Sequence, residues 1–238
     1  MKAMIFAAGL GKRLGEITES TPKALVEING KSILQLAVEK VAKHGFDDII
    51  INVHHFADKV EEEIAKLRKM GFMITISDER ELLLETGGGL FKAKYFFDKK
   101  PFLLYNADIV TDLDLFELYR FHIKNGAIAT LAVRNRPGKR FFLIDQSGLL
   151  KGWCNNLTGE EILVDSPRES LHETGFSGIH MADPEIFKFM EDGVYSLTPL
   201  YLKVAQSRKI FTFSHNEGFW ADIGTPVNLE QVRKYYCK

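Results

Sequence analysis

Cysteine is scarce in this 238-residue sequence, which contains only Cys154 and Cys237. Two widely separated cysteines supply neither a C-x-x-C zinc pattern nor the disulfide framework of a small secreted domain. The composition fits a reducing compartment, and we therefore expect a cytoplasmic protein.

The sequence also lacks an excess of charge of either sign and a long hydrophobic run. Lys and Arg number 31 against 32 Asp and Glu, which gives a net charge of −1. The charge-driven binding of a basic nucleic-acid protein has no global support, so we expect no nucleic-acid partner. No apolar run approaches the roughly 20 residues of a membrane span, so we expect no membrane partner either. Any site for an anionic ligand must be local.

What is present is the composition of an ordinary globular chain, with 45% hydrophobic and 26% charged residues. Continuous apolar runs of strand length suit strands that are buried on both faces of a sheet. They alternate with stretches of helical spacing, which predicts an α/β fold with a mostly parallel sheet. The strand runs are Ala3–Ala8, Ile49–Val53, Phe72–Ser77, Phe102–Asn106 and Ala127–Val133, and the helical stretches include Ile33–Lys43, Val60–Met70, Leu90–Phe97 and Leu115–Ile123.

The pattern changes after about Arg134. Phe141–Asp145 and Leu149–Trp153 flank Gln146-Ser147-Gly148, which predicts a hairpin and hence a mixed sheet. Helices are expected at Pro184–Met190, Leu197–Gln206 and Val227–Tyr236, and short strands at Ile210–Ser214 and Phe219–Asp222. Because no linker or repeat interrupts the chain, we expect a single domain over residues 1–238.

The densest chemical signal follows the first strand, in Ala7-Ala8-Gly9-Leu10-Gly11-Lys12-Arg13-Leu14-Gly15. Glycines that leave a strand end let backbone N–H groups turn toward a phosphate, and Lys12 and Arg13 add positive charge. The spacing is neither a dinucleotide fingerprint nor a Walker loop. A glycine-rich turn with two solvated bases is the plainer alternative.

Thr21-Pro22-Lys23 follows soon after. Pro22 favours an extended chain and would hold Lys23 beside the glycine loop, where it could serve as a fixed cation. Further on, Glu85-Thr86-Gly87-Gly88-Gly89 precedes a helical stretch. Three glycines would let a flat group such as a base approach the backbone, although a plain junction between a loop and a helix explains them equally well.

Two acidic residues occupy positions suited to a hard cation. Asp108 ends the run that begins at Phe102, and Asp222 stands between Trp220 and the turn Gly224-Thr225-Pro226. Open α/β sheets place ligand-binding groups at such strand ends, and two carboxylates with substrate phosphates are a usual arrangement for Mg²⁺. A helix cap is the plainer role for such an acid, and we assign that role to Asp112-Leu113-Asp114, which precedes the helical stretch Leu115–Ile123 and also resembles a glycosyltransferase D-x-D. The pair His54-His55 is expected to make a polar contact at a strand end.

Together these segments resemble the sugar-1-phosphate nucleotidyltransferases, the enzymes that make nucleoside-diphosphate sugars. The resemblance rests on five motifs in order: Ala7–Leu14, Thr21–Leu25, Glu85–Gly89, Asn106–Asp108 and Trp220–Thr225. It implies a Rossmann-like mixed sheet flanked by helices, the nucleotide-diphospho-sugar transferase fold, with a small extension on the sugar side. Residues 1–133 would form the nucleotide-binding half and residues 134–238 the sugar-binding half.

The same resemblance implies a role for each site residue. It implies nucleotide binding by Ala8, Gly9, Gly11, Lys12, Arg13, Lys23, Thr86 and Gly87, with Arg13 and Lys23 also catalytic. It implies sugar contacts by Asn106 and Glu173, and Mg²⁺ ligation by Asp108 and Asp222. The sequence departs from the common Gly-Thr-Arg at Gly11-Lys12-Arg13 and lacks the Glu-Lys-Pro segment that many relatives carry on the sugar side.

Within the family, Glu85–Gly89 and Phe176–Ile179 are most similar to the N-acetylmuramate 1-phosphate uridylyltransferases of peptidoglycan recycling. UTP and that sugar phosphate are then the expected substrates, and the protein would be a monomer or a small homo-oligomer. Enzymes that act on mannose, heptose or glucose 1-phosphate, or on phosphocholine, remain alternatives. A glycosyltransferase and a catalytically inactive nucleotide-sugar sensor are alternatives of a different class.

Overall fold

A computed structural model describes residues 1–9, 11–18 and 20–237, except for the side chains of Lys12 and Glu16. The helices are α1 (Ile33–Lys43), α2 (Ala57–Lys69), α3 (Glu85–Lys92), α4 (Leu115–Asn125), α5 (Leu197–Ala205) and α6 (Pro226–Tyr236). The shorter 3₁₀ helices are η1 (Lys12–Thr18), η2 (Lys23–Leu25), η3 (Ala93–Phe96), η4 (Arg168–Ser170) and η5 (Pro184–Phe189).

The strands of the first half are β1 (Lys2–Phe6), β2 (Glu27–Ile28), β3 (Lys31–Ser32), β4 (Asp48–Val53), β5 (Met73–Asp78), β6 (Phe102–Asn106), β7 (Ile109–Thr111) and β8 (Ala129–Arg134). Those of the second half are β9 (Arg140–Ile144), β10 (Leu150–Asn155), β11 (Glu160–Leu163), β12 (His172–Ala182), β13 (Ile210–Ser214) and β14 (Trp220–Asp222).

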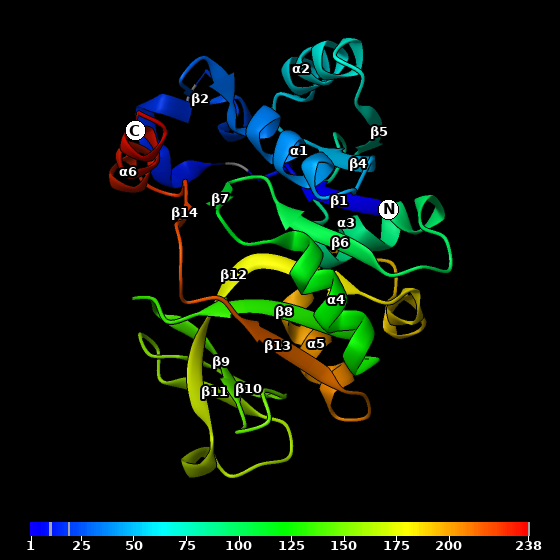
Figure 1. The fold of residues 1–238 in the computed structure, drawn as a ribbon, viewed down its shortest axis with the longest axis vertical. Helices are drawn as coiled ribbons and strands as arrows, with labels where there is room; N and C mark the ends of the chain where they lie inside the picture. The colour runs from blue at the N-terminus through cyan, green and yellow to red at the C-terminus, as the bar shows by residue number, and fades with distance from the viewer. Residues whose placement is uncertain (10, 19, 238) are drawn as a thin grey trace.

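Ten of the described strands form one mixed sheet in the order β11-β10-β9-β12-β6-β1-β4-β5, with β8 joined to β12 and β13 to β8. The other four form two small antiparallel sheets, β2 with β3 and β7 with β14. The strands β6, β1, β4 and β5 run parallel, and β12 is antiparallel to β6, β8 and β9. The hairpin β9–β10 and the edge strand β11 extend at the end of the molecule remote from α2 and β5 (Figure 1). The predicted mixed sheet and its extension are confirmed.

Alternating side chains of each parallel strand supply two cores, one on each face of the sheet. In β1, Ala3 and Ile5 pack among residues of α1, α2 and α4, whereas Met4 packs among residues of α3 and α5. A third apolar cluster joins α6 to η1, β2, β7 and β14. Figure 1 shows α6 returning beside β2, so the two ends of the sequence contribute to one region.

Several predicted helices and strands have the expected bounds, but one helix begins earlier than predicted and one long strand was not predicted. The expected strand Phe102–Asn106 and the expected helix Ile33–Lys43 have the predicted bounds. The cap predicted within Asp112–Asp114 is confirmed at Asp114, which accepts hydrogen bonds from Phe116 N and Glu117 N. However, α3 begins at Glu85 rather than at Leu90, so the three glycines lie inside the helix. The long strand β12 was not predicted because its sequence, HETGFSGIHMA, mixes glycine and polar residues and shows no simple apolar run.

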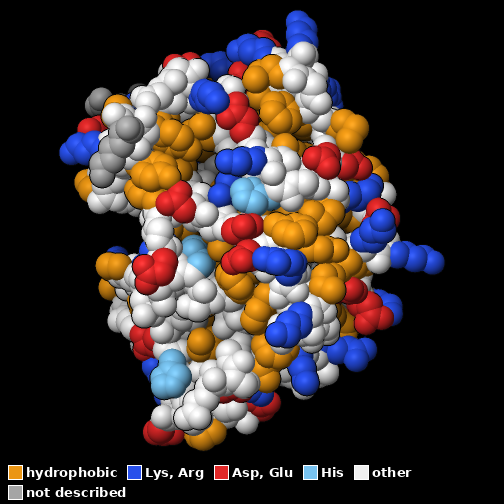
Figure 2. Space-filling view, viewed as in Figure 1, with side chains coloured by type: hydrophobic (Ala, Val, Ile, Leu, Met, Phe, Trp, Pro, Cys, Tyr) orange, Lys and Arg blue, Asp and Glu red, His pale blue; other side chains and the backbone are white. Residues whose placement is uncertain are grey.

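Acidic and basic side chains are interspersed over the described part of the face drawn in Figure 2. Among the described residues, the helices are too short or too polar to span a membrane.

Candidate active site

Two adjoining cavities open at the carboxyl ends of β1 and β6. The first, of about 400 Å³, is lined by the chain that follows β1, by Lys23 and by the start of α3. The second, of about 370 Å³, is lined by Arg13, by Asp222 and by residues of β9, β10 and β12. Asn106 and Asp108 line both cavities, so they mark the boundary between them. The arrangement suits two ligands that meet end to end.

The glycine loop borders the first cavity. Ala8 and Gly9 line it, and a Cβ added at Gly9 would meet nothing within 4 Å, so this part of the backbone is open to a ligand. Gly11 has a φ of +66°, and a Cβ there would lie 3.0 Å from the Cβ of Lys23. Glycine is therefore required where the loop turns and passes over Lys23. Leu10 and the side chain of Lys12 lie outside the described residues.

Lys23 lies at the start of η2, directly after Pro22, whose backbone is extended with ψ near 144°. Its Nζ donates a hydrogen bond to Oδ2 of Asp108, and the two side chains are 14% and 25% exposed. The half-buried ion pair holds a cation at the boundary of the cavities.

Asp108 and Asp222 come together through backbone pairing. Asp222 ends β14 opposite Ile109 of β7, and Ile223 N donates a 2.8 Å hydrogen bond to the carbonyl of Asp108. Both acids line the second cavity, and the side-chain amide of Asn228 orients the carboxylate of Asp222.

The donor set of these two acids fits a hard divalent cation. Carboxylate oxygens are the ligands that Mg²⁺ takes from proteins, and it draws the rest of its shell from substrate phosphates and water. The described residues contain no group of three His, Cys, Asp or Glu side chains arranged for a metal. A cation held by Asp108 and Asp222 would therefore need oxygen atoms from a ligand.

Arg13 lines the second cavity beside these acids, and its guanidinium group lies against Gly224. Two further arginines, Arg136 and Arg140, line the same cavity, and neither was assigned from the sequence. The guanidinium of Arg136 donates to the carbonyl of Phe176 at 3.1 and 3.3 Å and lies 5.3 Å from the Trp220 ring. Burial lowers the pKa of Arg136, while the charge of Asp222 opposes that shift. The arginines make this cavity suitable for an anionic ligand.

The remaining walls of the second cavity are aromatic or small. They are Phe141, Phe142, Trp153, Phe176, Ser177, Gly178, Thr198 and Trp220. Ser177 is buried, and its hydroxyl lies 2.7 Å from Nε2 of His215, whose pKa burial and the nearby Arg134 lower to about 4. His215 is therefore neutral at pH 7. The sequence offers one signal for this cavity, the arginine-rich segment from Arg134 to Arg140, which contains two of its arginines. The residues that surround this segment in the fold depend on the position of β12.

Glu173 does not lie in the site. Its carboxylate accepts hydrogen bonds from Asn156 Nδ2 at 3.0 Å and from Arg168 Nη2 at 2.5 Å, and it lines neither cavity. The predicted sugar contact has no geometric support, because an exposed ion pair on the extension already occupies this carboxylate. Asn106, in contrast, lies where both ligands would meet.

The glycines of α3 serve a different purpose from the predicted one. A Cβ added at Gly87 would collide with the ring of Tyr195, and Gly87 N donates to the Tyr195 carbonyl at 2.8 Å. The flat group that approaches this backbone is therefore a side chain of the protein. Thr86 lines the first cavity together with Glu85, and its hydroxyl accepts a hydrogen bond from Leu197 N.

The sequence profile of the nucleotidyl transferase family matches residues 2–238. The chain is 31% identical to a UTP–glucose-1-phosphate uridylyltransferase of Synechocystis over 94% of its length, but it spans only 60% of that protein. It is 28% identical to an N-acetylmuramate α-1-phosphate uridylyltransferase of Caulobacter vibrioides, covering 94% of this chain and 92% of the relative.

Solved structures share the fold. The structure of HddC from Yersinia pseudotuberculosis complexed with GMP-PN superposes with a TM-score of 0.78, covering 99% of each chain at 20% sequence identity. This likeness confirms the predicted nucleotide-diphospho-sugar transferase fold.

Proposed function

The chain belongs to the nucleotidyl transferase family, and from that premise we propose that it transfers a nucleotidyl group from a nucleoside triphosphate to a sugar 1-phosphate. The observation that carries the proposal is the pair of adjoining cavities that share Asn106 and Asp108. The triphosphate would lie along the glycine loop in the first cavity, and the sugar phosphate would enter the second. Their reacting phosphates would then meet at Lys23 and Asp108.

The chemistry needs neither a general base nor a covalent nucleophile. A phosphate oxygen of the sugar 1-phosphate is already ionised, so it can attack the α-phosphorus directly. One P–O bond forms to the acceptor, the bond to the β-phosphate breaks, and pyrophosphate leaves with the bonding electrons. The obstacle is the repulsion between two polyanions.

This chain's residues address that repulsion. Lys23 would neutralise charge at the α-phosphate, and Arg13 would neutralise charge on the leaving pyrophosphate. Gly9 and Gly11 would let the loop backbone follow the triphosphate, and Asn106 would orient the sugar phosphate for in-line attack. We propose Asp108 and Asp222 as the ligands of Mg²⁺, which when bound would supply charge neutralisation between the two substrates.

We propose UTP as the nucleotide. Glu85 lines the first cavity, and a carboxylate only accepts hydrogen bonds. Uracil offers an imide N–H to such an acceptor. Guanine offers two adjacent N–H donors, so GTP with mannose or heptose 1-phosphate is the second candidate.

For the acceptor we propose N-acetylmuramate 1-phosphate, in cell-wall sugar recycling in the cytoplasm. This sugar carries a carboxylate in addition to its phosphate, and Arg136 and Arg140 line the second cavity beside Arg13. The guanidinium groups of Arg136 and Arg140 suit an acceptor with two anionic groups. The same arginines disfavour the cationic headgroup of phosphocholine.

Pyrophosphate release tests the proposal, measured with Mg²⁺ across four nucleoside triphosphates and a panel of sugar 1-phosphates plus phosphocholine. We expect release with UTP and N-acetylmuramate 1-phosphate, and a nucleotide sugar of the matching mass. Release only with GTP and mannose or heptose 1-phosphate would keep the reaction and replace the substrates. No release from any pair, with a UDP-sugar consumed instead, would replace the proposal with a glycosyltransferase.

A further inference from the structure

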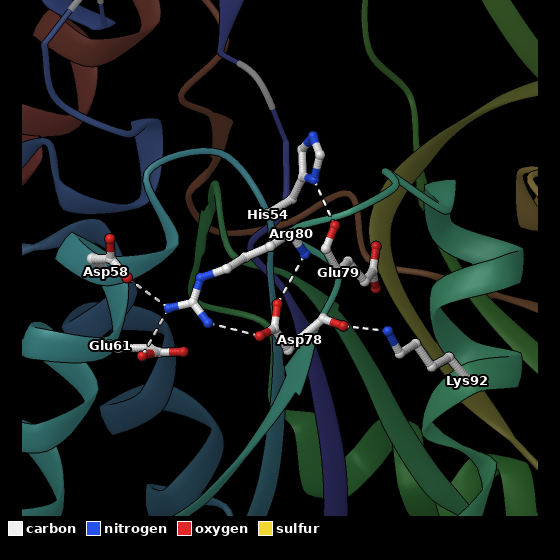
Figure 3. Close-up of polar contacts among 7 residues, drawn as sticks. All are labelled: His54, Asp58, Glu61, Asp78, Glu79, Arg80 and Lys92. Carbon is white, nitrogen blue, oxygen red and sulfur yellow. Dashed lines mark hydrogen bonds and ion pairs between the residues drawn. The ribbon is translucent and has the colours of Figure 1, made fainter.

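Glu79 is a carboxylate buried beside the first cavity, with only 1% of the residue exposed. It directly follows β5, and its neighbours Asp78 and Arg80 direct their side chains to an exposed cluster (Figure 3). Burying a carboxylate is costly unless hydrogen bonds replace the lost water. The identity of its partners therefore indicates what the residue does.

Each carboxylate oxygen of Glu79 accepts one hydrogen bond. Oε1 accepts from Asn52 Nδ2 at 2.9 Å, and Oε2 accepts from Leu84 N at 3.2 Å. The main chain is also held, because Glu79 N donates to Val53 O at 2.8 Å and Nδ1 of His54 lies 2.7 Å from the Glu79 carbonyl. The predicted polar contact of His54 at a strand end is thus confirmed, and the carboxylate is fixed on both sides.

The two partners lead to opposite walls of the first cavity. Asn52, itself buried and lining the cavity, accepts a 2.8 Å hydrogen bond from the backbone N–H of Ala7, where the glycine loop leaves β1. Leu84 directly precedes Glu85 and Thr86, which line the other wall. One carboxylate therefore connects the glycine loop to the start of α3.

The third glycine of α3 allows this connection. A Cβ at Gly89 would lie 2.7 Å from Oε1 of Glu79 and 3.2 Å from Nδ2 of Asn52. Any larger residue would displace the carboxylate from the amide. Within the glycine cluster, Gly89 thus leaves room for the carboxylate of Glu79, and Gly87 leaves room for the ring of Tyr195.

We propose that Glu79 is a positioning residue that holds the two walls of the first cavity at the spacing a nucleoside triphosphate needs. The proposal rests on the function proposed above. Glu79 acts through Asn52 and the backbone of Leu84, and it lines neither cavity itself. Loss of the carboxylate is therefore expected to weaken nucleotide binding without removing any group that contacts the reacting atoms.

A matched control lies one residue away. Asp78 pairs with Arg80, whose guanidinium also bonds Asp58 and Glu61 of α2 (Figure 3). Asp78→Asn makes the same change of carboxylate to amide in the same segment, but the Asp78 carboxylate bonds only the guanidinium and the backbone N–H of Arg80, and an exposed ion pair contributes little. Comparing this variant with Glu79→Gln separates a positioning role of Glu79 from a general increase in mobility of the segment after β5.

The variant Glu79→Gln keeps the shape of the side chain but brings an N–H donor toward Asn52 Nδ2 or Leu84 N. We expect the KM for UTP to rise about tenfold, because a buried N–H donor is left without an acceptor. The kcat and the KM for the sugar phosphate should stay within about twofold of the wild-type values. Asp78→Asn should leave all three constants within about twofold. Equal effects of the two substitutions, or a fall in kcat at an unchanged KM for UTP, would overturn the proposal.

Amide hydrogen exchange of the substrate-free protein provides a test that does not depend on the reaction. Glu79→Gln should accelerate exchange in two peptides, one that covers Ala7–Gly9 and one that covers Leu84–Thr86. Asp78→Asn should accelerate exchange in neither. Acceleration in neither peptide would overturn the connection even if the enzyme is active. If the wild type turned over no substrate pair, the proposed function would fail, while the exchange result would still decide whether Glu79 connects the walls.

Discussion

The ammonium group of Lys23 and the carboxylate of Asp108 form an ion pair at the boundary between the two cavities. The carboxylate that would bind a metal thus holds the lysine that would bind a phosphate. A triphosphate would draw Lys23 away from Asp108, because the phosphates offer more negative charge. Under the proposed function, the arrival of the nucleotide would therefore free a metal ligand.

The first prediction concerns that pair. Lys23→Ala should lower kcat by at least about 10²-fold, because a cation is lost where charge develops in the transition state. It should also tighten binding of Mn²⁺ to the nucleotide-free protein, since Asp108 loses its partner. Steady-state kinetics and calorimetric titration with Mn²⁺ measure the two effects, and an unchanged kcat would remove Lys23 from the mechanism.

The second prediction concerns the two acids. Asp108→Asn and Asp222→Asn should each abolish detectable turnover while circular dichroism and the unfolding temperature remain close to those of the wild type. An amide keeps the size of the side chain but is a much weaker ligand for a divalent cation. Turnover at the wild-type rate in either variant would exclude that residue as a metal ligand.

The third prediction separates the second cavity from the extension. Arg136→Ala and Arg140→Ala should raise the KM for the sugar phosphate about tenfold and leave the KM for UTP unchanged, because an ionic hydrogen bond to the acceptor is lost. Glu173→Gln is the control and should change neither constant, since Glu173 pairs with Arg168 outside the cavities. A larger effect at Glu173 than at Arg136 would restore the sugar contact expected from the sequence.

The fourth prediction concerns the base. Glu85→Gln presents a donor as well as an acceptor, so the preference for UTP over CTP in kcat/KM should fall by about tenfold. Competition between the two nucleotides in one reaction measures this ratio directly. A preference unchanged from the wild type would mean that Glu85 does not read the base.

The fifth prediction follows from the pKa of Glu79. Burial raises this pKa, and the hydrogen bonds from Asn52 and Leu84 oppose the shift, as do the charges of Lys92 and His54. Protonation would remove an acceptor, so the KM for UTP should rise as the pH falls through the raised pKa, and Glu79→Gln should lack this rise. The free energy of unfolding should change in the opposite sense, because the pKa of Glu79 is higher in the folded than in the unfolded state. The stabilisation from this carboxyl group is fully present at a pH below its unfolded-state pKa, and it is lost as the pH rises through its folded-state pKa. Chemical denaturation of the wild type and of Glu79→Gln across pH checks that sign.

The sequence predicted those parts of the candidate site that lie in short local motifs. The Ala8–Gly11 loop, Lys23, Asn106 and Asp108 each stand within a few residues of a recognisable motif, and parallel strands bring their carboxyl ends to one edge. Local spacing was therefore sufficient to propose them as site residues without knowledge of the distant contacts.

The remaining parts depend on contacts between distant segments. Gly87 packs against Tyr195, and no local pattern records that neighbour. Arg136 enters the second cavity because β12 passes beside β8 and β9, and β12 has no simple apolar alternation. Glu79 has the sequence context of a surface acid, because it lies in a charged stretch. In the fold it is buried, with Gly89 and Asn52 packed against its carboxylate.

The most direct test of the central claim follows the α-phosphate of the nucleotide. UTP labelled at the α-phosphorus is incubated with N-acetylmuramate 1-phosphate, Mg²⁺ and the wild-type protein, and the products are separated and identified by mass. Nucleotidyl transfer predicts that all of the transferred label enters the UDP-sugar and that unlabelled pyrophosphate is released in equal amount. Label that remained in UTP, or that appeared in UMP without any nucleotide sugar across the whole panel of acceptors, would contradict the account.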